Sequence, residues 1–201
     1  MTRYLTLGLL AEGPEDEIFL STLAIRQLTR LAARAPMPFD VADTVQRGEA
    51  STARTAHVRL CEEAQDLATT CDLLLVHNDH RERAKIDKLR QDAAPPFDCR
   101  MVAVVPVRET EAWLLADCGL LRSLPGAVTS ALPWAGEPTG AQVERVSDPK
   151  ALLAAVLPGY DTRTLAELLG QRVDLDRLHT LPGYQRWCAE LTNALKELHF
   201  L

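Results

Sequence analysis

Three short apolar runs in this sequence each lead into side chains that bind metals or transfer protons. Glu12 follows the first run. The second run leads into His77 and Asp79, and another leads to Glu111. Magnesium prefers carboxylates and water, and it often needs only one or two carboxylates when a substrate phosphate completes its shell. The four side chains are therefore candidates for a divalent-cation site that acts on phosphate esters.

Each of these side chains has a predicted role. Glu12 and Asp79 are candidate catalytic residues and ligands of Mg²⁺ or Mn²⁺, and His77 is a further candidate ligand. Glu111 is a third candidate catalytic residue, which would bind the ion or position water. A zinc site is disfavoured because no cysteine lies near His77 and no second ligand pair supports it. A purely structural role for Glu12 and Glu111 at helix starts is the alternative, because acids there favour the helix macrodipole.

Basic residues follow the second cluster closely. Arg81, Arg83 and Lys85 are predicted to contact nucleic-acid phosphates, and Lys88 and Arg90 continue the basic pattern. Alternating charges are also typical of a solvated helix face, and no aromatic stacking partner accompanies these residues.

The spacing of apolar residues predicts the elements that position these side chains. Strands are predicted over residues 3–10, 39–45, 73–76 and 101–105, and helices over 14–34, 51–70 and 81–92. Strands that alternate with helices at these lengths indicate an α/β fold with a mainly parallel sheet flanked by helices. Because ligands bind at the carboxyl ends of such strands, the acidic clusters are expected along one edge of the sheet.

The pattern of alternating strands and helices ends at about residue 118. Residues 1–118 are predicted to form the α/β domain, and residues 119–201 a helical extension packed on it. The last helix has one continuous apolar face, formed by Tyr184, Trp187, Cys188, Leu191, Leu195 and Leu198. This face is expected to dock on the sheet domain or on a partner.

Composition excludes several classes of protein. The 201 residues are 47% apolar and carry a net charge of −6, so nucleic-acid binding through bulk charge is excluded and only a local basic patch remains. The five cysteines are odd in number and form no CxxC pair, which suggests a reducing compartment. No apolar run approaches the ~18 residues of a membrane span. We therefore expect a cytoplasmic protein without membrane contacts, whose oligomeric state the sequence does not specify.

Motifs for dinucleotide binding, P-loop hydrolysis and serine hydrolysis are absent from the sequence. Five segments of the sequence resemble a divergent branch of the Toprim-domain proteins of bacteria and archaea. These segments are LGLLAEGPEDEIFL, LLLVHNDHRE, AVVPVRETEAWLLAD, DPKALL and VDLDRLHTLPGYQRWCAEL. Together they cover nearly the whole chain. The combination of EG near the start with EAWLLAD after the fourth strand is more specific than either segment alone.

This resemblance implies a Toprim-like Rossmannoid fold, in which a glutamate and an Asp-x-Asp pair hold magnesium. The glutamate corresponds to Glu12. The pair corresponds either to His77 and Asp79 or to Asp79 and Arg81, so one aspartate is replaced in either alignment. Three further carboxylates could supply the missing charge: Glu82, Glu109 and Glu111.

Two functions follow from these residues and from the resemblance. The first is a metal-dependent nuclease that works with a partner such as an ATPase, as the related overcoming-lysogenization-defect endonucleases imply, with DNA or RNA as its substrate. The alternative is a non-catalytic Toprim-like scaffold or regulatory subunit with a degenerate metal site, which the missing aspartate and the acidic net charge favour.

Overall fold

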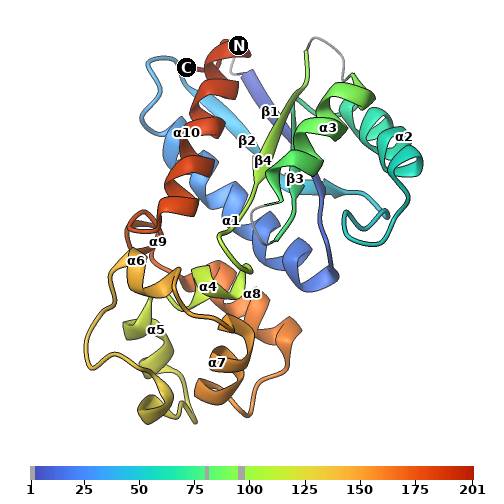
Figure 1. The fold of residues 1–201 in the computed structure, drawn as a ribbon. Coiled ribbons are helices and arrows are strands. Elements are labelled where there is room, and N and C mark those ends of the chain that lie inside the picture. The colour runs from blue at the N-terminus through green and yellow to red at the C-terminus, as the bar shows by residue number, and fades with distance from the viewer. Residues whose placement is uncertain (1–2, 80–81, 95–97) are drawn as a thin grey trace.

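The computed structural model of the chain describes residues 3–79, 82–94 and 98–201 (Figure 1). Its centre is a sheet of four parallel strands in the order β2-β1-β3-β4. The strands are β1 (Arg3–Leu10), β2 (Phe39–Arg47), β3 (Leu73–His77) and β4 (Arg100–Val104). The predicted α/β fold with a parallel sheet is therefore confirmed.

Three helices connect the strands: α1 (Pro14–Ala32), α2 (His57–Ala68) and α3 (Arg83–Ala93). The prediction that the second helix begins at residue 51 was wrong, because the preceding segment instead binds the ends of two strands. The Thr52 amide donates to the Ala11 carbonyl at 3.0 Å, and its hydroxyl donates to the His77 carbonyl at 2.6 Å. These bonds fix the carboxyl ends of β1 and β3 relative to each other.

Successive residues of the strands point to opposite faces of the sheet. On one face, Leu7 and Leu75 belong to a buried cluster with α1 and the C-terminal helices. On the other, Leu74 and Val76 pack with α2 and α3. The central strands are therefore covered on both faces, which explains why they read as uninterrupted apolar runs.

The remainder of the described chain is helical. It comprises α4 (Glu111–Leu114), α5 (Cys118–Ser123), a 3₁₀ turn η1 (Thr129–Ala131), α6 (Gly140–Val143), α7 (Pro149–Val156), α8 (Thr162–Arg172), α9 (Leu175–Leu178) and α10 (Pro182–Glu197). Helix α8 packs on α1, and α10 packs on β4 (Figure 1). The Arg26 guanidinium of α1 donates to the carbonyls of Gly170 and Val173, both at 2.7 Å. One buried cluster spans both parts; the division into residues 1–118 and 119–201 stays a prediction.

Side chains from the two helices beside the edge strand β4 form hydrogen bonds with its outward-facing backbone groups. The amide of Ala103 donates to the Glu190 carboxylate of α10 at 3.0 Å, and Arg90 of α3 donates to the Met101 carbonyl at 2.8 Å. Arg90 and Glu190 also form an ion pair at 2.7 Å. Edge groups occupied in this way are protected from pairing with another chain.

An aromatic cluster connects α4 to α10. The ring centroids of Trp113 lie 5.3 Å from Tyr184 and 5.8 Å from Trp187, and all three side chains are buried. Trp113 lies two residues after Glu111, so this packing fixes the start of α4. Within the described ranges, no helix is long and apolar enough to cross a membrane.

We expect Trp113→Ala to lower the free energy of unfolding by about 3–5 kcal/mol, the usual cost of removing a buried aromatic side chain. Urea unfolding followed by circular dichroism measures this change. The control is Val58→Ala on α2, whose side chain is 72% exposed; it should alter stability by no more than about 0.5 kcal/mol. Equal effects of the two substitutions would contradict the role of this cluster.

Candidate functional site

The carboxyl ends of β1 and β3 bring Glu12 and Asp79 together. The Glu12 carboxylate accepts hydrogen bonds from the Asn78 side chain and from the backbone amide of Asp79, both at 3.0 Å. Partial burial raises the pKa of Glu12, but these two bonds and the nearby His77 lower it by more, so the net shift is downward. Glu12 is therefore held as a carboxylate beside the end of β3.

His77 ends β3 and lies between two carboxylates. Its ring has no solvent exposure, Nε2 lies 3.1 Å from Asp79 Oδ1, and Nδ1 lies 3.9 Å from Asp16 Oδ2. Burial lowers the pKa of His77, whereas the hydrogen bond to Asp79 and the charge of Asp16 raise it, and the net direction is upward. This arrangement favours a protonated imidazole that neutralises the carboxylates over the predicted role of His77 as a metal ligand, because a metal-bound nitrogen must be unprotonated.

Asp16 is a member of the site that the sequence analysis did not name as a candidate site residue. It lies in the first turn of α1, four residues after Glu12, and its carboxylate accepts a 2.5 Å hydrogen bond from the Thr110 hydroxyl. Burial, together with the charges of Asp79 and Glu12, raises the pKa of Asp16. The available signal was its place in the first turn of the helix that directly follows Glu12 and Gly13.

Thr110 carries the cluster onward to the segment after β4. Its hydroxyl lies 3.5 Å from the Glu111 carboxylate, which also lies 3.7 Å from the Lys150 ammonium. Burial raises the pKa of Glu111, and the neighbouring Asp16 contributes in the same direction. In the described part of the chain, Oε2 of Glu109 is buried without a hydrogen-bond partner. Acidic side chains that follow β1, β3 and β4, together with one from α1, thus converge at the carboxyl ends of the strands. These side chains are called the acidic cluster: Glu12, Asp16, Asp79 and Glu111.

The predicted phosphate-contacting residues occupy different surroundings. Arg83 forms an ion pair with Glu190 at 2.7 Å. Lys85 pairs with Glu82, and its charge also contributes to lowering the pKa of Glu12, so it lies near the acidic edge. Arg81 lies outside the described residues.

The donor set consists mainly of carboxylate oxygens, which suits Mg²⁺ or Mn²⁺ better than softer metals. Among the residues that the structure describes, no three acidic, histidine or cysteine side chains already form a group that could hold an ion. Asp79 instead uses Oδ1 to bind His77. An ion would therefore have to compete with the imidazole for the carboxylates.

The raised pKa of His77 predicts a pH-dependent stability. A pKa above 6.5 in the folded chain means that the contribution is complete below pH 6.5 and is lost as the pH rises through the folded-state value. His77→Gln should therefore cost more stability at about pH 6 than at about pH 9. Urea unfolding in metal-free buffer at both pH values tests this.

The control is Val58→Ala, which removes no titratable group and should cost the same at both pH values. If His77→Gln behaves in the same way, the paired imidazolium is ruled out.

Comparison with known proteins adds a family to this geometry. No curated protein and no solved structure was found that matches the chain. Residues 11–192 match a family described as a domain of unknown function, DUF4276, and this range contains the whole acidic cluster and most of α10. The chain belongs to the DUF4276 family.

Proposed function

We propose that this chain is a divalent-cation-dependent phosphoryl-transfer enzyme, a Toprim-like nuclease that works with a partner such as an ATPase. The observation that carries the proposal is the convergence of Glu12, Asp16, Asp79 and Glu111 from separate elements on one edge of a parallel sheet. Carboxylates gathered at the carboxyl ends of parallel strands are suited to a ligand or an ion. Burying like charges raises the free energy of the folded chain, and a bound cation would offset that cost.

In this proposal Glu12, Asp16 and Asp79 hold Mg²⁺ or Mn²⁺. When bound, such an ion would polarise a phosphodiester and would lower the pKa of an attacking water. Glu111, whose pKa is raised by burial, accepts a proton more readily than an exposed carboxylate and serves as the general base. His77 keeps Asp79 and Asp16 in position and offsets their charge.

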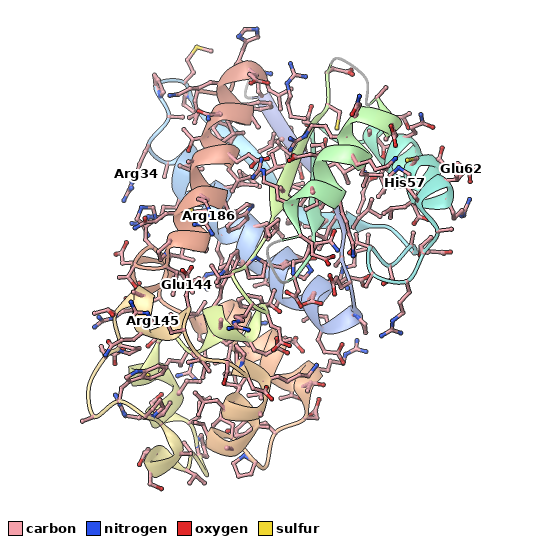
Figure 2. All side chains as sticks on the ribbon, in the orientation of Figure 1. Arg34, His57, Glu62, Glu144, Arg145 and Arg186 are labelled. Carbon is pink, nitrogen blue, oxygen red and sulfur yellow. The ribbon has the colours of Figure 1, made fainter. Side chains whose placement is uncertain are left out.

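A basic groove along β4 supports a nucleic-acid substrate. It has a volume of about 760 Å³ between α3, β4 and α10, and it is lined by two carboxylates, Glu190 and Glu197, and by four arginines: Arg83, Arg90, Arg100 and Arg186. Arg83 and Arg90 pair with Glu190, and Arg100 pairs with Glu197. Arg83 and Arg186 also line a neighbouring hollow of about 380 Å³ with Glu144. Figure 2 labels Arg186 and Glu144. Arginine is well suited to phosphate because its planar guanidinium donates two parallel hydrogen bonds. A strand that follows the groove and the neighbouring hollow would run along β4 from Arg100 to Val105 and Val107, beyond the carboxyl end of β4.

The five cysteines are all free thiols, and four of them are buried. Free thiols persist in reducing compartments, so the proposed enzyme works in the cytoplasm.

A second candidate is a non-catalytic scaffold, and the hydrogen bonding of the site favours it. Glu12 Oε1 is already bound by Asn78 and Asp79, and Asp79 Oδ1 is bound by His77. Arg83 is paired with Glu190. A site in which the chain satisfies its own carboxylates can serve structure alone.

Metal binding separates the two candidates. For the enzyme, Mn²⁺ or Mg²⁺ should bind the wild type, and Asp79→Asn and Glu12→Gln should each weaken binding by more than the about 10- to 100-fold that the loss of an outer-shell partner costs. Isothermal titration measures the affinity, and a plasmid-nicking assay with the ion that binds measures activity.

The matched control is Asp43→Asn, at an exposed carboxylate on β2. It should bind the ion and nick DNA like the wild type. No binding at millimolar ion to the isolated wild-type chain would reject the enzyme and leave the scaffold.

The groove gives a separate prediction. Arg186→Ala should weaken DNA binding uniformly across sequences and reduce the slope of log affinity against log salt by about 1, as expected when one phosphate contact is lost. Fluorescence anisotropy with a labelled oligonucleotide over a salt series measures this slope. Arg34→Ala, at an exposed residue on the other side of α10 (Figure 2), is the control. An unchanged slope in Arg186→Ala would remove the groove from the proposal.

A further inference from the structure

A largely apolar pocket opens beside the acidic cluster, where the helical extension meets the α/β part. Its volume is about 160 Å³. Buried apolar side chains from four helices form its walls: Phe19 of α1, Leu114 of α4, Leu153 of α7, and Leu165 and Ala166 of α8. Polar groups lie among the remaining lining residues: Glu15, Thr110, Glu111, Lys150, Tyr160 and Thr162. An apolar pocket with a few polar groups is the usual form of a small-molecule site.

Two residues belong to both this pocket and the acidic cluster. Thr110 donates to Asp16 at 2.5 Å and lies 3.5 Å from Glu111, and both Thr110 and Glu111 line the pocket. Glu15, another lining residue, directly precedes Asp16 in α1. A molecule bound with one part in the pocket would therefore extend its other part toward the proposed metal ligands.

The size and charge of the pocket limit what can enter it. An apolar cavity of about 150 Å³ is known to bind benzene, so this pocket has room for one six-membered ring. A fused two-ring system is larger and would not fit without movement of the walls. Two carboxylates and one ammonium surround the opening, so an anionic group is repelled and an uncharged ring is preferred.

We infer that this pocket receives the base of a pyrimidine nucleotide, whose phosphate then lies at the acidic cluster. The inference rests on the proposed function, which supplies the phosphodiester. The apolar walls cover the faces of the ring. Lys150 donates to a base carbonyl, and Thr162, which lies 3.3 Å from Glu15, offers a second polar contact to the ring edge. The pocket thereby selects the nucleotide next to the bond that is cleaved.

The first test uses nucleosides, so that neither phosphate nor metal is required. Saturation-transfer NMR of the full chain in metal-free buffer should detect binding of thymidine, and deoxyguanosine should give a signal at least about 10-fold weaker because its fused rings do not fit. If thymidine fails to bind, or if deoxyguanosine binds equally well, the inference is overturned.

Two neighbouring alanines of α7 provide a matched pair of variants. Ala154 is exposed and lines the pocket, whereas Ala155 is exposed and does not line it. Ala154→Phe should fill the opening and abolish thymidine binding, and Ala155→Phe should bind like the wild type. Because both positions are exposed, neither substitution overpacks the core, and circular dichroism verifies that both variants fold. Equal binding by the two variants would overturn the inference.

These outcomes are independent of the metal titration. Thymidine binding that Ala154→Phe abolishes, in a chain that binds no metal, would keep the pocket and reject the proposed chemistry. Metal binding and nicking that Ala154→Phe leaves unchanged, with no thymidine binding to the wild type, would keep the chemistry and reject the pocket as its base-binding site.

Discussion

The acidic cluster at the carboxyl ends of the strands depends on one buried ring, that of His77. Burying an ionised group is costly unless an opposite charge and hydrogen bonds compensate it. His77 has no solvent exposure, and Asp79 and Asp16 provide that compensation from β3 and α1. The backbone amide of Asp79 in turn donates a hydrogen bond to the Glu12 carboxylate, and the Asp16 carboxylate accepts one from the Thr110 hydroxyl. The His77 ring at the end of β3 therefore lies among side chains from three strand ends.

The edge of β4 makes α10 a necessary part of this arrangement. An unpaired strand edge is open to association with other chains. Here Glu190 and Arg90 bind the outward-facing backbone groups of Ala103 and Met101. Glu190 also forms an ion pair with Arg83, so one carboxylate binds both the edge of β4 and an arginine of the basic groove. The last helix of the chain thus stabilises β4 and fixes the charge pattern beside its end.

The helices between α4 and α10 have a different consequence. Helix α8 packs on α1, and Arg26 fixes the end of α8 through two carbonyls. This packing leaves a small apolar pocket that Thr110 and Glu111 of the acidic cluster help to line. The sheet thus supplies the proposed chemistry, and the helical extension supplies the proposed selectivity.

Local patterns in the sequence were sufficient for the strands, for the parallel α/β fold and for the amphipathic last helix, because apolar periodicity depends only on neighbouring residues. The proximity of Glu12 and Asp79 was also predictable, since the carboxyl ends of parallel strands meet at one edge of the sheet. The position of Asp16 in the site, the raised pKa of His77 and the pairing of Arg83 with Glu190 were not predictable, because each depends on a partner distant in sequence. The same holds for Thr52, whose helical pattern was overridden by hydrogen bonds to the ends of β1 and β3. Tertiary structure alone decided which charges lie together and how far burial shifts their pKa values, because both depend on distances and solvent exposure that a local pattern does not contain.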